Sequence, residues 1–214
     1  NEQTAVTVEP TITTSDVDLD ALNGGAGDYA GATLRAANNG GDQANDLFTI
    51  VNGAHFTVSG SNLVDSSNNV FATFTGGNGT QLVITFTSSG TPATTALVQD
   101  VAQHIQYTNT SDTPPASVDV VIALNDGDFV SGNQGTEPNN SFLDSIATDV
   151  VTVNITAIND APVNVTGGTI GTGEDAVDAW MSGMSISDPD ADPATAVMIV
   201  NFGVEHGTLN IRTD

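Results

Sequence analysis

Apolar and polar residues alternate in several short segments, and this two-residue period limits the possible fold more than any other feature of the sequence. In residues 118–124 every second position holds Val, Ile or Leu, and residues 151–155 repeat the pattern with Thr and Asn in between. Successive side chains of a β-strand point to opposite faces, so such segments form strands with one buried face in an antiparallel sheet. Further strands are expected at residues 5–9, 47–51, 55–59, 70–74, 82–87, 149–157, 196–202 and 208–212. Many short strands separated by polar turns are typical of a β-sandwich, so the sequence predicts an all-β fold of this kind.

One segment has a helical period instead. Leu97, Val101 and Ile105 are four positions apart within residues 94–107, which places them on one face of a short amphipathic helix. Thr94 or Thr95 is expected to cap its N-terminus, because a threonine side chain can accept a hydrogen bond from the N–H groups of the first turn. We expect this helix to cover one edge of the sandwich without a functional role.

A domain boundary is expected at the tetrapeptide Asn159-Asp160-Ala161-Pro162, which directly follows a strand pattern. Proline lacks a backbone N–H and biases the preceding residue toward an extended conformation, so Pro162 ends the strand. Residues 1–160 are therefore predicted to form one β-sandwich domain with long loops. Residues 161–214 contain fewer strand patterns than the about seven strands of a sandwich. They are predicted to form the N-terminal half of a second, truncated domain.

The charge of the chain excludes several classes of function. It carries 26 acidic residues against 2 arginines and no lysine, for a formal net charge of −24. Such a surface repels phosphate, so we expect no binding to nucleic acid and no docking on anionic lipid. The chain has no cysteine for a thiol nucleophile or a cysteine-ligated metal, and no apolar run long enough for membrane insertion. Its three histidines are far apart in the sequence and it lacks a Gly-x-Ser-x-Gly motif, so we expect no catalytic residues and no enzymatic activity.

The acidic residues occur in groups at expected strand ends and loops. Several groups have the spacing Asp-x-Asp, and alternate side chains of an extended chain project to the same side. Oxygen ligands in such groups suit Ca²⁺, which takes 6–8 of them. The alternative is a solvated acidic surface, in which each carboxylate faces water alone. The groups are Asp16, Asp18 and Asp20; Asp126 and Asp128; Asn159 and Asp160; Glu174 and Asp175; and Asp188, Asp190 and Asp192.

Three parts of the sequence carry a resemblance to a known family. They are the segment 105–115, the Asn125-Asp126-Gly127 turn with the later Asn-Asp-Ala-Pro joint, and the residues 173–175 and 186–191 beyond that joint. Together with the expected hairpin at 205–209, they resemble bacterial cadherin-like tandem repeats of large secreted adhesins. The resemblance covers most of residues 94–214 and, more weakly, residues 5–60. It implies Greek-key cadherin- or immunoglobulin-like sandwiches on the bacterial cell surface, with Ca²⁺ bound between successive domains.

The same resemblance implies a set of metal ligands. Asn159 and Asp160 match the linker residues, Glu174 matches an early glutamate of the following domain, and Asp188 and Asp190 match its Asp-x-Asp pair. In the first domain, Asp126 of the Asp-Gly turn lies at the opposite pole, and Glu9 is a looser match to the early glutamate. The complete set of expected Ca²⁺ ligands is Asp16, Asp18, Asp126, Asp128, Asn159, Asp160, Glu174, Asp188 and Asp190.

Two functions are compatible with these patterns. The first is a structural extender that Ca²⁺ makes rigid at the joint between domains, with the neighbouring repeats of the same chain as its partners. The second is a calcium-dependent, lectin-like adhesion domain that binds a glycan or a surface protein. The long expected loops at residues 23–46 and 129–144 leave room for the second function.

Overall fold

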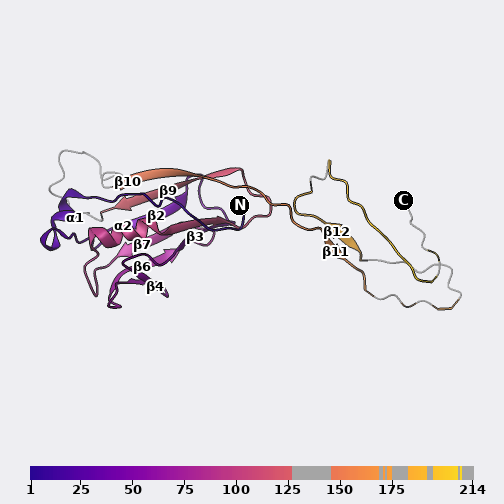
Figure 1. The fold of residues 1–214 in the computed structure, drawn as a ribbon, viewed down its shortest axis with the longest axis horizontal. Helices are drawn as coiled ribbons and strands as arrows, with labels where there is room; N and C mark the ends of the chain where they lie inside the picture. Colours follow the sequence, from indigo (N-terminus) through magenta and orange to yellow (C-terminus); the bar gives the residue numbers. More distant parts are fainter. Residues whose placement is uncertain are drawn as a thin grey trace. The chain divides into compact units, whose positions relative to one another are not determined.

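The structure is a computed structural model in which two compact units are distinguished, Asn1–Ile158 and Asn159–Asp214. It describes residues 1–126, 146–168, 171, 173–174, 183–191, 195–206 and 208. Throughout these residues the regular structure is mainly β, with only short helices, as Figure 1 shows. The predicted all-β character is therefore confirmed.

The first unit contains two antiparallel sheets in its described part. The larger sheet has seven strands in the order β10-β9-β2-β7-β6-β5-β4, and the smaller has three in the order β1-β8-β3. The strands are β1 (Val6–Thr7), β2 (Thr33–Asn38), β3 (Asp46–Ile50), β4 (Thr57–Ser59), β5 (Asn62–Val64), β6 (Val70–Gly76), β7 (Leu82–Phe86), β8 (Ile105–Asn109), β9 (Ser117–Asn125) and β10 (Ile146–Asn154). Because β2 pairs with β9 on one side and β7 on the other, residues far apart in sequence form the centre of the larger sheet.

Both sheets contribute to one hydrophobic core. Phe48 and Tyr107 of the smaller sheet pack with ring centroids 5.3 Å apart, and Leu34 and Ile84 of the larger sheet belong to the same buried cluster. The alternation predicted for residues 118–124 is confirmed, since all four apolar residues of that face are buried. Two sheets that share one core in this way form a sandwich-like arrangement.

The predicted helix is shorter than expected. Helix α2 (Thr95–Gln103) is capped by Thr94, one of the two predicted candidates, whose side chain accepts from the N–H of Leu97. The helix ends before Ile105, which instead begins β8 and pairs with Ile50 of β3. The four-residue spacing that includes Ile105 was therefore misleading, because pairing with β1 and β3 satisfies the backbone of this β-branched and aromatic segment better than another helical turn.

Other elements also depart from the sequence predictions. Strands β2, β5 and β8 were not predicted, nor were the short helices α1 (Val17–Ala21) and η1 (Asn23–Gly25). In the second unit, β11 (Val163–Val165) pairs with β12 (Ser185–Ser187). The strand predicted at 196–202 is wrong: this segment lies within the described residues and forms no strand. Most of the strand predicted at 208–212 lies outside the described residues.

The described helices are all short. The longest of them is the nine-residue α2, and none has the length and apolar character needed to cross a membrane.

Candidate metal centre

Four of the predicted Ca²⁺ ligands meet in the second unit. Asp188 follows β12 directly, and its Oδ1 accepts a hydrogen bond from the N–H of Asp190 over 3.0 Å. Oδ2 of Asp190 in turn accepts from the N–H of Asp160 over 2.5 Å, although the two residues are 30 positions apart. The side-chain amide of Asn159 donates to the carbonyl oxygen of Asp160 over 2.9 Å. The residues of the Asn-Asp joint and the Asp-x-Asp pair are thus neighbours in space.

The local sequence explains the turn that carries Asp188 and Asp190. Pro189 stands between them and fixes its own φ, which favours a turn directly after the strand. An aspartate at the start of a turn commonly accepts from the N–H two residues later, and Asp188 does so here. This contact holds the two carboxylates on one short turn. Because an ionised carboxylate has about four acceptor sites, each retains capacity for a cation.

The carboxylates do not form a complete cage in the structure. Within the described ranges, no group of three or more His, Asp or Glu side chains is arranged closely enough to hold a metal ion. The oxygen donors that converge here fit the ligand preference of Ca²⁺, but its 6–8 ligands would have to include main-chain oxygens and water.

Asp16 and Asp18 have a different setting from the one predicted. The Asp-x-Asp run was expected to be extended, but Asp16 is the N-cap of α1 and its Oδ1 accepts from the N–H groups of Asp18 and Leu19 over 2.9 and 2.8 Å. Residues two positions apart on a helix do not face each other. The premise that placed these two carboxylates on one side is therefore wrong, because the capping bonds favour a helical turn over an extended chain.

Asp20 joins this helix to the rest of the first unit. Its Oδ1 accepts from the hydroxyls of Tyr29 and Thr95 over 2.7 and 2.5 Å, and its Oδ2 accepts from the N–H of Asp16 over 3.1 Å. Burial raises the pKa of Asp20, but the hydrogen bonds from Thr95, Tyr29 and Asp16 outweigh it and lower that pKa below its usual value. Burial and the neighbouring Asp20 both raise the pKa of Tyr29. Asp20 thus has a structural role.

The remaining predicted ligands are spread over both units. Asp126 is partly buried directly after β9, and Glu174 is exposed in a turn of the second unit. Asp128 lies outside the described residues, as do Asp175 and Asp192.

Besides Glu2, two buried acids of the first unit were not singled out from the sequence. Asp46 is 2% exposed, and its carboxylate accepts from Tyr107 Oη over 2.6 Å and from Asn38 Nδ2 over 2.7 Å. Asp100 is 6% exposed on α2, with its oxygens 3.1–3.3 Å from Nδ1 of His104 and His55. The only sequence signal was the position of Asp100 beside Leu97 and Val101 on the apolar face of a predicted helix. Both acids stabilise the packing of elements distant in sequence.

Comparison with family models, curated proteins and solved structures returns no match for this chain. The function is therefore inferred from the residues and geometry of the chain itself.

Proposed function

We propose that this chain is a calcium-binding structural module, an extender of a large bacterial cell-surface adhesin of the cadherin-like tandem-repeat type. In this proposal Ca²⁺ at the joint between domains makes the chain rigid, and the partners are neighbouring repeats of the same chain. The observation that supports it best is the hydrogen-bonded convergence of Asp160, Asp188 and Asp190. We further propose that the sheets of the first unit form a Greek-key sandwich of the cadherin or immunoglobulin type.

The chemistry of calcium accounts for the acidity of the chain. A net charge of −24 opposes compact structure by self-repulsion. Carboxylates held on one turn repel each other, and a bound divalent cation offsets that repulsion while it crosslinks the segments that supply its ligands. Binding to the folded state alone stabilises it by about 2.7 kcal/mol when the free ion is at a hundredfold excess over Kd. Extracellular modules commonly bind Ca²⁺ with Kd of about 10⁻⁴–10⁻³ M, which suits calcium-rich surroundings.

Calorimetric titration of the metal-free protein with Ca²⁺ tests this function. We expect saturable binding and a higher melting temperature in millimolar Ca²⁺ than in chelator. The double variant Asp188→Asn/Asp190→Asn retains oxygen acceptors for the turn but removes two charges, so it should lose most of the binding at this centre. The matched control Asp42→Asn/Asp112→Asn makes the same change in net charge at exposed positions of the first unit.

The proposal is wrong if the metal-free protein takes up no Ca²⁺ and its melting temperature is unchanged. The assignment of Ca²⁺ binding to this centre is wrong if both double variants lose binding equally. That result would indicate a general attraction of cations to an acidic surface.

A second candidate function is carbohydrate binding. A cavity of about 660 Å³ in the first unit is lined largely by amide and hydroxyl side chains, with Asp46 and Asp119 beside them. Amides, hydroxyls and carboxylates are the groups that hydrogen-bond sugar hydroxyls, and the volume lies within the range of small-ligand sites. The lining includes Asn38, Asn39, Gln43, Asn45, Asn109, Ser111, Thr113 and Ser117. A glycan array read with Ca²⁺ and with chelator distinguishes the functions, since an extender predicts no specific glycan signal under either condition.

A further inference from the structure

Several asparagines of the first unit are followed directly by glycine, and in such a pair the asparagine side chain can react with the main chain. The side-chain carbon Cγ can close a five-membered ring with the nitrogen of the next residue, and glycine has no side chain to obstruct this approach. The pairs are Asn23-Gly24, Asn39-Gly40, Asn52-Gly53 and Asn78-Gly79. All four asparagines are exposed, so exposure does not distinguish them.

In three of these pairs the N–H of the glycine is held in a hydrogen bond. The bonds run from Gly40 to Oδ1 of Asn38 over 2.8 Å, from Gly53 to the carbonyl oxygen of Phe56 over 3.2 Å, and from Gly79 to the carbonyl oxygen of Asp46 over 2.8 Å. The side chain of Asn52 is held as well, because its Oδ1 accepts from the N–H of Val58 over 2.8 Å. A nitrogen in such a bond attacks a neighbouring carbon only after the bond has opened.

The pair Asn23-Gly24 differs from the other three. Among the described residues, no group accepts a hydrogen bond from the N–H of Gly24, and the side chain of Asn23 makes none. The turn that contains the pair is closed by its neighbours, since the carbonyl oxygen of Leu22 accepts from the N–H groups of Gly25 and Gly27 over 2.9 and 3.1 Å. The nitrogen of Gly24 is therefore free to react without the loss of a hydrogen bond.

The surroundings of this pair also leave room for the main chain to rotate. A Cβ atom placed on Gly24 or Gly25 would meet no other atom within 4 Å. At Gly53, by contrast, it would collide with the side chains of Phe56 and Asp100, and at Gly79 it would lie 3.3 Å from the main chain of Ala44. Ring closure needs a change of main-chain torsion, so open space favours it at Gly24.

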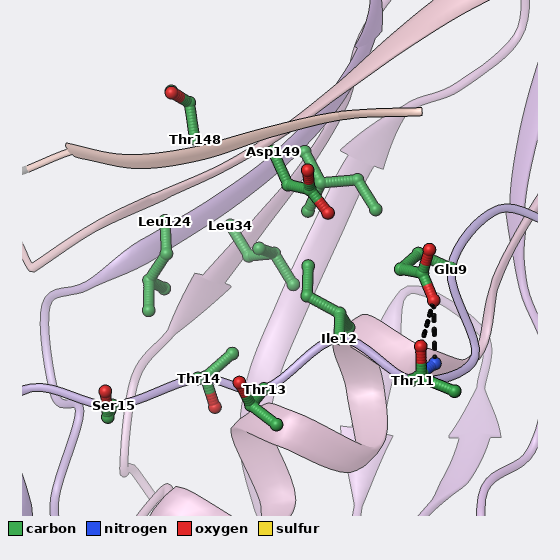
Figure 2. Close-up of a pocket in the computed structure, with 11 residues that line it drawn as sticks. Glu9, Thr11, Ile12, Thr13, Thr14, Ser15, Leu34, Leu124, Thr148 and Asp149 are labelled. Carbon is green, nitrogen blue, oxygen red and sulfur yellow. Dashed lines mark hydrogen bonds between the residues drawn. The ribbon is translucent and has the colours of Figure 1, made fainter. Parts of the chain in front are cut away.

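Another irregular segment of the first unit shows the opposite situation. Figure 2 shows residues 9–15 beside a cavity of about 440 Å³, where the carboxylate of Glu9 accepts from the hydroxyl and the N–H of Thr11 over 2.5 and 3.0 Å. The side-chain amide of Gln103 on α2 also donates to the carbonyl oxygen of Ile12 over 2.9 Å. This segment is held by the rest of the unit and contains no asparagine, so the reactive combination belongs to the turn after α1.

We propose that Asn23 is a site of spontaneous covalent modification, at which the asparagine is converted to aspartate and isoaspartate. The nitrogen of Gly24 gives its proton to a base in the solvent and bonds to Cγ of Asn23, and the bond from Cγ to the side-chain nitrogen breaks, which releases ammonia. Water then opens the cyclic imide. Opening at Cγ gives aspartate, whereas opening at the main-chain carbonyl carbon gives isoaspartate, in which the main chain continues through Cβ and Cγ. Water is the only co-reactant, and either product adds one carboxylate to the chain.

Peptide mapping of the whole protein after incubation in mildly alkaline buffer tests the proposal. Digestion with pepsin in acid stops the reaction, and mass spectrometry then measures the conversion of amide to acid at each of the four pairs in one sample. We expect Asn23 to convert about 2- to 12-fold faster than each of the other three asparagines, which is the factor given by the net free energy of one hydrogen bond.

The same incubation in guanidinium chloride separates the effect of the fold from that of the local sequence. All four asparagines are followed by glycine, so their rates should become similar once the protein is unfolded. The proposal is overturned if Asn23 is not the fastest site in the folded protein. It is equally overturned if the lead of Asn23 persists in full in the denaturant, because the free N–H of Gly24 would then not be its cause.

Discussion

Individual acidic residues of this protein have distinct roles despite their similar appearance in the sequence. Asp16 caps a helix, Asp20 receives hydrogen bonds from Tyr29 and Thr95, and Asp46 is buried with Tyr107 and Asn38. Hydrogen bonds to a charged group contribute about 1.5–3 kcal/mol each, which exceeds the typical value for neutral pairs. A high content of acids therefore does not imply that each serves a metal, since several stabilise the first unit directly.

At the residue scale, we predict that Asp20→Ala lowers the free energy of unfolding by about 1–3 kcal/mol. The substitution leaves the hydroxyl of the fully buried Tyr29 without its acceptor. Because folding lowers the pKa of Asp20, its stabilising contribution is present above the usual aspartate pKa of about 3.9 and is lost as the pH falls through the folded value. Denaturant unfolding at pH 7 and below pH 4 should show the difference between the two proteins shrink in acid.

The control for this substitution is Asp18→Ala, which removes the same charge from an exposed position of the same helix. If Asp18→Ala destabilises the protein as much, the effect of Asp20 is one of helix charge rather than of its hydrogen bonds.

At the scale of elements, the segment 195–206 is notable for the exposure of its large apolar side chains. Its side chains Val197 and Ile199 are 87% and 85% exposed, whereas strands such as β3 and β7 of the first unit bury every second residue. An isolated pair of strands such as β11 and β12 is marginally stable without further strands or a packed face. Contiguous exposed apolar surface of this kind promotes association.

We predict that this segment gives the whole chain a binding surface for a hydrophobic dye. The protein should increase the fluorescence of anilinonaphthalene sulfonate, and Val197→Ser/Ile199→Ser should reduce that increase substantially. Val17→Ser is the control, because Val17 is equally exposed, at 89%, but stands alone on α1. Equal dye fluorescence in all three proteins would show that the segment is covered in solution.

At the scale of the whole molecule, the two units differ in the hydrophobic core that can stabilise their fold. Among the residues that the structure describes, the buried hydrophobic cluster lies in the first unit, and both of its sheets contribute to it. In the second unit, the described part contains only one two-stranded sheet. Cooperative unfolding requires a shared core, so the stability of the chain should reside in the first unit.

We therefore predict that a fragment of residues 1–158 unfolds cooperatively, with a midpoint temperature within a few degrees of that of the whole chain in chelator. Residues 159–214 alone should show no cooperative transition by circular dichroism. A fragment 1–158 that is unfolded would contradict this division and show that the second unit stabilises the first.

The sequence by itself determined the features that depend on local chemistry. The two-residue period of 118–124 and 151–155 identified strands with one buried face, and the helix cap was expected at Thr94 or Thr95, of which Thr94 is the cap. These signals are local because side chains alternate along any extended chain and a cap bonds only to the next turn.

Only the tertiary structure decided how distant segments combine. It ended α2 before Ile105 in favour of pairing with β1 and β3. Among the described residues, the segment 196–202 has no strand partner despite its apolar character. It also buried Asp46 and Asp100, placed Asp190 beside Asp160, and turned the run at Asp16 into a helix. Strand pairing and burial depend on residues that are remote along the chain, and their free energy is gained only when those residues meet, so a local pattern cannot reveal them.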